Sequence, residues 1–260
     1  MKRVVFLIFL FFQLHLVAQQ DSLQFNYDKK VLLETEHFIG TDNFDYTYTL
    51  SNNVIEKKGR QREYVYNNIQ LGEVEHVDIT NPLKIVAFYK EQNAVVILDN
   101  TLSEITIINF NSTEEFKKVN QATSAFDNNI WVFNEITQQL ELYDYIEGNT
   151  LISSLPFDET TEDQKSNYNY CWLITKSTIY CYNAYGSIVS EIKNDGFTNI
   201  KMHRNNAILF KEDSLSYLSN IDNIEKIELV PQISIKDFSI NNETLYIYDG
   251  EFVHHFKLLK

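Results

Sequence analysis

A recurring asparagine-marked turn divides most of this sequence into six similar units. An Asn stands at the entrance to a strongly apolar segment at intervals of 36 to 47 residues. The positions are Asn43, Asn81, Asn128, Asn167, Asn205 and Asn241. Asn suits such places because it tolerates the left-handed backbone conformation that tight turns often require. A period of about 40 residues predicts an array of small four-stranded sheets.

The strands within the units have the composition of a layered β-structure. The 16 Tyr and 18 Phe favour half-buried pleated surfaces. Some middle strands, most clearly Ile85 to Tyr89, are apolar at successive positions, which predicts cover on both faces. Stacked sheets provide that cover better than a simple sandwich does. The innermost strand of the fourth unit is the least marked, because the stretch before Tyr170 is polar.

The last unit is one strand short. It offers Ile233 to Ile240, Thr244 to Tyr248 and Glu251 to Leu259. We therefore expect Leu23 to Tyr27, near the start of the chain, to supply the missing outer strand. Such closure of a ring removes an exposed sheet edge.

With this closure the chain resembles the six-bladed β-propeller class of secreted and envelope proteins, over residues 19–260. The resemblance implies an all-β fold with a single β-propeller, closed by an N-terminal strand that completes the last blade. Five or seven blades remain alternatives, since short hairpins can be miscounted. No Trp-Asp blade ending and no Tyr-Trp-Thr-Asp motif is present, so the resemblance stops at the class.

Residues 1–18 have the pattern of a secretory signal peptide. Lys2 and Arg3 precede the apolar run Val4 to Leu14, and a short Leu16-Val17-Ala18 segment follows. The run is shorter than the roughly 20 residues that span a bilayer, which predicts a mature chain with no transmembrane segment. We expect a secreted protein of the periplasm, the outer envelope surface or the extracellular space.

The charge of the chain restricts its partners. The formal net charge is −14 at pH 7. Phosphate backbones are repelled by such a chain, so nucleic acid is not an expected partner. Acidic residues also keep a secreted protein soluble.

The only two cysteines, Cys171 and Cys181, fall in neighbouring strands of the fourth unit. If this hairpin turns through Thr175-Lys176-Ser177, the two residues lie directly opposite each other. They then form a cross-strand disulfide in an oxidising compartment or remain two buried thiols.

Three histidines, His37, His76 and His203, lie near innermost strands and are candidates to line a central channel. A trio of this kind could bind a metal or an anion. The alternative is three ordinary hydrogen-bonded histidines, which we favour because no carboxylate is spaced with them as a recognisable site. We expect no metal and no cofactor.

The densest acidic stretch is the candidate for contact with a partner. It lies between the third and fourth units, and we expect a solvated loop there. Its candidate residues are Phe157, Asp158, Glu159, Glu162 and Asp163. The carboxylates could face a basic protein with Phe157 as an apolar anchor, since loops on rigid scaffolds often carry binding.

No catalytic motif accompanies these features. The sequence lacks a G-x-S-x-G elbow, an H-E-x-x-H helix and a Gly-rich phosphate loop. We therefore expect a non-catalytic binding or scaffolding propeller that contacts a protein partner through one rim. The alternative is a small-ligand or glycan-binding propeller, enzymatic if residues from several blades converge at the central channel.

Overall fold

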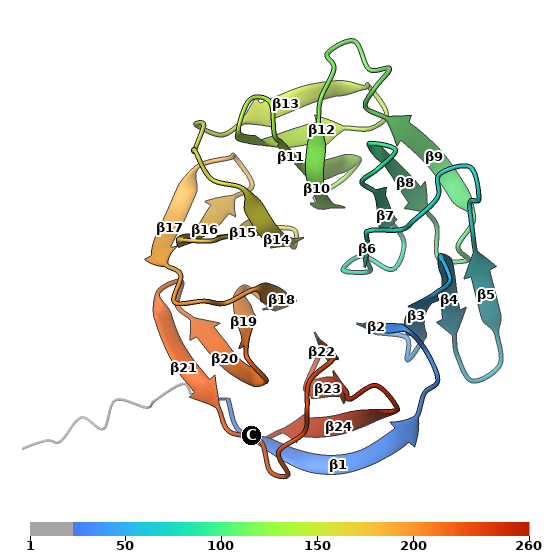
Figure 1. The fold of residues 1–260 in the computed structure, drawn as a ribbon, viewed down its shortest axis with the longest axis vertical. Helices are drawn as coiled ribbons and strands as arrows, with labels where there is room; N and C mark the ends of the chain where they lie inside the picture. The colour runs from blue at the N-terminus through green and yellow to red at the C-terminus, as the bar shows by residue number, and fades with distance from the viewer. Residues whose placement is uncertain (1–22, 260) are drawn as a thin grey trace, which may run out of the picture.

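The protein is a ring of six four-stranded antiparallel sheets (Figure 1). The computed structural model describes residues 23–259, and no helix occurs within them. The signal peptide expected at residues 1–18 lies outside the described residues. The six-bladed fold predicted from the repeat is confirmed.

The first three blades follow chain order from the axis outwards. Blade 1 contains β2 (His37–Thr41), β3 (Thr47–Ser51), β4 (Val54–Lys58) and β5 (Glu63–Tyr66). Blade 2 contains β6 (His76–Asp78), β7 (Ile85–Tyr89), β8 (Ala94–Leu98) and β9 (Glu104–Asn109). Blade 3 contains β10 (Val119–Ser124), β11 (Asn129–Asn134), β12 (Gln139–Asp144) and β13 (Asn149–Ser153).

The other three blades complete the ring. Blade 4 contains β14 (Thr161–Ser166), β15 (Tyr170–Thr175), β16 (Thr178–Asn183) and β17 (Ile188–Lys193). Blade 5 contains β18 (Asn199–His203), β19 (Asn206–Lys211), β20 (Ser214–Ser219) and β21 (Asn223–Ile227). Blade 6 contains β22 (Asp237–Asn241), β23 (Thr244–Tyr248), β24 (Phe252–Leu258) and β1 (Phe25–Leu32).

Each pair of neighbouring blades shares its own apolar cluster. Strand β7 shows the arrangement, because Ile85, Ala87 and Tyr89 pack toward blade 1 whereas Val86 and Phe88 pack toward blade 3. All five residues are buried. The unbroken apolar runs in the sequence therefore reflect sheets that are covered on both faces, as predicted.

The ring closes through β1, which pairs antiparallel with β24. The register joins Phe25 to Leu258 and Leu32 to Phe252. The closure predicted from residues 23–27 is confirmed, and the strand runs further, to Leu32. Phe25 is buried in the apolar cluster between blades 5 and 6.

The apolar part of this closure should be essential to stability. We expect Phe25→Ala to lower the free energy of unfolding by about 3 kcal/mol, because a buried aromatic ring leaves a cavity behind. Val31→Ala is the control, since Val31 lies on the same strand with 48 % of its surface exposed. Urea unfolding of both variants measures the difference, and equal effects would contradict this role of Phe25.

Candidate functional site

Side chains of the innermost strands connect one blade to the next near the axis. On β6, β14 and β22, an aspartate accepts a hydrogen bond from a backbone N–H of the innermost strand of the following blade. The pairs are Asp78 Oδ2 with Ser124 N at 2.8 Å, Asp163 Oδ2 with Ile200 N at 2.9 Å, and Asp237 Oδ2 with Phe38 N at 3.0 Å. These bonds satisfy backbone groups that have no strand partner on that side.

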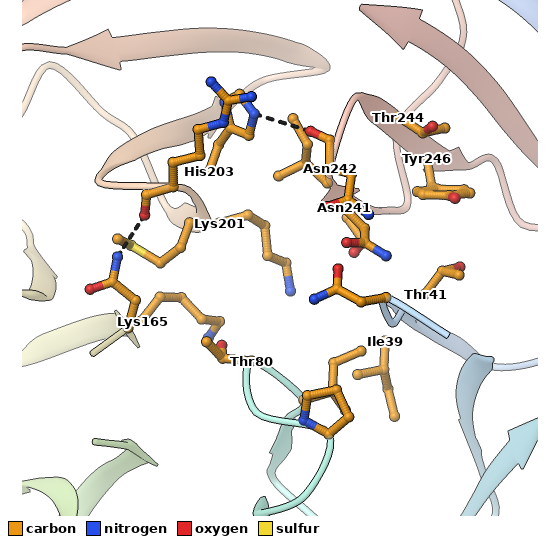
Figure 2. A pocket seen from close by; sticks show the side chains of 18 of the residues that line it. Ile39, Thr41, Thr80, Lys165, Lys201, His203, Asn241, Asn242, Thr244 and Tyr246 are labelled. Atoms are coloured by element: carbon orange, nitrogen blue, oxygen red, sulfur yellow. Dashed lines mark hydrogen bonds between the residues drawn. The ribbon is translucent and has the colours of Figure 1, made fainter. Parts of the chain in front are cut away.

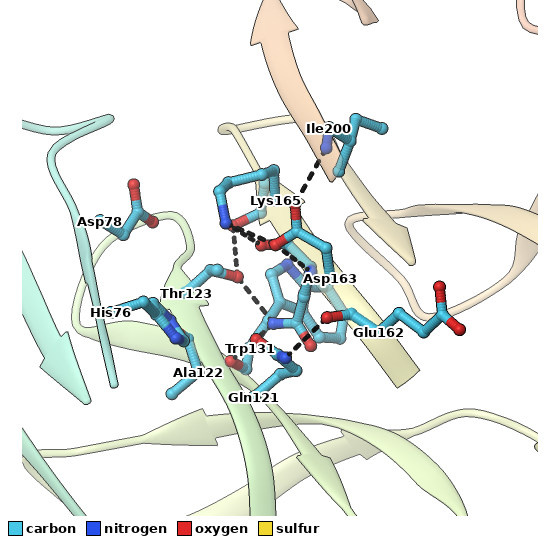
Figure 3. A network of polar contacts seen from close by, with 12 residues as sticks. His76, Asp78, Gln121, Ala122, Thr123, Trp131, Glu162, Asp163, Lys165 and Ile200 are labelled. Atoms are coloured by element: carbon cyan, nitrogen blue, oxygen red, sulfur yellow. Dashed lines mark hydrogen bonds and ion pairs between the residues drawn. The ribbon is translucent and has the colours of Figure 1, made fainter. Parts of the chain in front are cut away.

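Blades 3 and 4 have the densest of these connections (Figure 3). Gln164 Nε2 donates to Thr123 Oγ1 at 2.7 Å and to Trp131 O at 3.0 Å. On the same strand, Lys165 Nζ and Asp163 Oδ1 form an ion pair at 2.7 Å. The polar stretch that the sequence marked only weakly as the fourth innermost strand is β14, and its side chains find partners on blades 3 and 5 and within the strand itself.

A cavity of about 770 Å³ lies at one end of the axis, where innermost strands lead into their second strands (Figure 2). Its lining is polar and comes mainly from blades 1, 2, 4, 5 and 6. The charged residues that line it are Lys165, Lys201, Arg204, Lys257, Asp45, Asp78 and Glu243. Carboxamides and hydroxyls surround them, so the cavity has the donors and acceptors of a ligand site.

Lys201, on β18, extends its side chain into this cavity (Figure 2). Its Nζ makes no hydrogen bond or ion pair with any of residues 23–259, and it lies 6.0 Å from the centroid of the Phe238 ring. Burial, and next the charge of Lys165, lower the pKa of Lys201 to about 8. Asp163 and Asp237 act in the opposite direction.

The three candidate histidines lie on innermost strands, as expected, but at different blade interfaces. His203 lines the cavity, with Nε2 3.2 Å from Asn242 O. His76 Nε2 is 2.6 Å from Ala122 O, and burial, then the charge of Lys165, lower the pKa of His76 to about 4. His37 is exposed, with Nδ1 3.8 Å from Asp237 Oδ2. The structure therefore does not unite the three histidines in one channel site.

Within residues 23–259, no three His, Cys, Asp or Glu side chains are grouped so that they could hold a metal ion. None of these residues belongs to a helix long and apolar enough to cross a bilayer.

The acidic segment is a loop only in its first half. Phe157 stacks between Phe133 and Tyr180, with ring centroids 5.1 and 5.0 Å apart. Glu159 accepts hydrogen bonds from the turn after β15, including the Ser177 hydroxyl at 2.8 Å.

The second half of the segment departs from the expected solvated loop, because Glu162 and Asp163 belong to β14. Asp163 is buried in the contacts described above, whereas Asp158 and Glu162 are exposed. Three of the five candidate residues, Phe157, Glu159 and Asp163, thus have partners within the fold.

The cysteine register differs from the expectation by one residue. Cys181 lies opposite Trp172, and Cys171 lies opposite Tyr182. Because successive residues of a strand face opposite sides, Cys171 packs between blades 3 and 4 and Cys181 between blades 4 and 5. Both are free, buried thiols, and the predicted direct opposition is wrong.

The sequence did not single out Lys201, although His203, two residues later, was expected near an innermost strand. The available signal was a single lysine in the middle of the segment Asn199–His203. A side chain at that position of an innermost strand faces either the axis or a neighbouring blade, and the spacing of residues does not say which.

No protein-family model matches the sequence, and no curated protein matches it. Solved structures do share the architecture. A chain in the crystal structure of the mitotic checkpoint complex has 9 % identity and a TM-score of 0.62, over 100 % of this chain and 99 % of that one. A streptogramin B lyase has 11 % identity and a TM-score of 0.59, over 89 % and 98 %.

BamB from Moraxella catarrhalis has 8 % identity and a TM-score of 0.50, over 90 % of this chain and 99 % of that one. At these identities the likeness concerns the fold alone. The chain is a six-bladed β-propeller.

The buried ion pair on β14 supports the fold rather than an external contact. We expect Asp163→Asn to lower the free energy of unfolding by about 3 kcal/mol, because Lys165 loses its charged partner in a buried setting. The exposed neighbour Glu162→Gln is the control and should change stability by less than about 0.5 kcal/mol. Similar midpoints in urea for the two variants would contradict this role.

The thiols should be protected in the folded protein. Burial raises the pKa of Cys181 to about 12 and that of Cys171 well above its usual value. Because the thiolate is the reactive form, iodoacetamide should leave native protein unmodified at pH 8 and add two labels after denaturation. Intact-mass measurement checks both, and a protein lighter by two protons with no labels would instead indicate a disulfide.

Proposed function

We propose that this chain is an exported, non-catalytic binding propeller that contacts a protein partner through one face of the ring. The proposed surface, here called the cavity face, is formed by the loops that join first to second and third to fourth strands. Its inner loops are residues 42–46, 79–84, 125–128, 167–169, 204–205 and 242–243. The mouth of the axial cavity opens on this face.

The distribution of exposed aromatic side chains carries the proposal. The cavity face presents Phe44, Tyr168 and Tyr185, which are 67 %, 67 % and 80 % exposed. The loops of the opposite face present one such residue, Phe116, at 56 %. Phe44 and Tyr168 directly adjoin residues that line the cavity. Exposed aromatic residues are the side chains most enriched at the energetic centres of protein interfaces.

Two further observations support the proposal. The apolar run that follows Lys2 and Arg3 supports export. A propeller chain of similar architecture occurs within the mitotic checkpoint complex, which is an assembly of proteins. Rigid stacked blades suit such a role because binding requires little reordering of the scaffold.

The partner should be lost when the aromatic residues of the cavity face are removed. We expect the triple variant Phe44→Ala, Tyr168→Ala, Tyr185→Ala to reduce recovery of a stoichiometric partner at least tenfold, in cross-linked pull-downs from the native envelope or secreted fraction. The matched control removes three exposed apolar residues of the opposite face. These changes are Phe116→Ala, Leu155→Ala and Val230→Ala.

Recovery with the control should equal that of the wild type. Loss of the partner only with the control would place the contact on the wrong face. Absence of any stoichiometric partner with the wild type would count against a protein-binding function.

The axial cavity favours a second candidate function, the binding of a small polar ligand. A volume of about 770 Å³ lies within the ~300–1,000 Å³ typical of ligand sites. One histidine, His203, lines the cavity, together with three carboxylates, three lysines, one arginine, carboxamides and hydroxyls.

A further inference from the structure

We propose that the axial cavity binds a hydroxyl-rich monocarboxylate, such as a sugar acid, with its carboxylate against Lys201 Nζ. This inference rests on the second candidate function and adds the chemical class of the ligand and the residue that anchors it.

Lys201 differs from the other lysines held inside the ring, because each of those has a partner. Lys57 is 3.6 Å from Asp42, Lys117 is 2.7 Å from Glu141, and Lys165 is 2.7 Å from Asp163. Lys84 donates to three backbone carbonyls at 2.6 to 2.9 Å. The fold thus satisfies its other enclosed ammonium groups, as desolvation requires, and directs the Lys201 amine into the cavity.

A second set of unused polar groups lines the same cavity. These side chains make no hydrogen bond with any of residues 23–259. They are the carboxamides of Asn43, Asn241 and Asn242 and the hydroxyls of Thr41, Thr80 and Ser239. Carboxamides and hydroxyls both donate and accept, which matches the hydroxyls of a carbohydrate better than an apolar ligand.

The charges around the cavity favour a single negative charge on the ligand. Lys165 is already neutralised by Asp163, and Lys257 Nζ donates to Thr244 Oγ1 at 2.7 Å. Arg204 and Lys257 also line the wall, together with Asp45, Asp78 and Glu243. Apart from Lys201 and the Lys165–Asp163 pair, the lining therefore holds two cations and three carboxylates and offers no second net positive charge. Lys201 therefore matches one carboxylate better than a polyphosphate or a dicarboxylate, whose further negative charges would face the surplus carboxylates of the wall.

The ionisation of Lys201 gives the site a characteristic pH dependence. The amine binds a carboxylate only when it is protonated, and its pKa of about 8 makes affinity fall as pH rises through that value. The charged groups that face it are Asp163 and Lys165 from β14, Asp78 from β6 and Asp237 from β22. The cavity also presents Asp45, His203, Arg204, Glu243 and Lys257. Burial lowers the pKa of His203, so this group stays neutral between pH 7 and 9.

The test is calorimetric titration of purified protein with D-glucuronate at pH 7, beside D-glucose, D-glucarate, acetate and inorganic phosphate. We expect glucuronate to bind at least tenfold more tightly than each of the others. Glucose lacks the charge, acetate lacks the hydroxyls, and glucarate and phosphate have the wrong charge or shape. Affinity for glucuronate should fall about tenfold from pH 7 to pH 9, as the amine deprotonates.

Variants assign the binding to Lys201. We expect Lys201→Met to weaken glucuronate binding about 10- to 100-fold, since a charge-assisted hydrogen bond is lost. Lys201→Arg should retain binding and lose its dependence on pH up to 9, because guanidinium stays protonated. The control is Lys226→Met, on the outer strand β21 of the same blade, where Lys226 is exposed and pairs with Glu228 at 3.1 Å. Thermal unfolding confirms that each variant is folded.

The outcomes that would contradict glucuronate binding at Lys201 can be distinguished from failure of the small-ligand function and of the protein-binding function. Glucuronate that fails to bind folded wild-type protein, or binds equally to Lys201→Met, would overturn it. Tighter binding of glucose or phosphate would overturn the ligand class but leave a small-ligand function standing. None of these results bears on recovery of a protein partner, which is measured separately.

Discussion

The structure depends on how six separate sheets are held in one ring. Backbone ladders run only within blades, so no strand pairs with a strand of a neighbouring blade among the described residues. Apolar clusters join the blades over most of their width, and polar side chains join them near the axis, where backbones converge. Asp78, Asp163 and Asp237 each accept one hydrogen bond from a backbone N–H of the following blade. The axis of this propeller is polar for a structural reason before any functional one.

The need for polar contacts between blades near the axis explains which strands could be predicted from the sequence and which could not. The unit length, the apolar middle strands and the missing strand of the last unit favoured a six-bladed ring closed by its N-terminal strand, with five or seven blades left as alternatives. Strand β14 was not recognised because Thr161–Ser166 is polar, and its side chains find their partners on β10, β11 and β18 and within β14 itself. The cysteine register was displaced by one residue because the turn after β15 is shorter than assumed, and a shift of one residue reverses every side chain.

The candidate site was harder to predict than the fold, because its residues come from several blades. His37, His76 and His203 were correctly placed on innermost strands, yet only His203 lines the cavity. Assigning the strands shows which residues lie near the axis of the ring. It does not show at which height along the axis each side chain lies, and this height decides whether the side chain reaches the cavity. Lys201 becomes conspicuous only once the partners of the other enclosed lysines are known. An unsatisfied group is a property of three-dimensional surroundings and leaves no mark in sequence spacing.

The pairing of β1 with β24 also determines the order in which the molecule can be assembled. Phe25 and Leu258 are neighbours in the last blade although nearly the whole chain separates them. During synthesis, β1 emerges first and has no partner until β24 follows. An edge strand must therefore stay unpaired while five other sheets form, and it is then that self-association is most favourable. The arrangement that leaves the finished ring without a seam also means that the last blade cannot be completed until β24 is available.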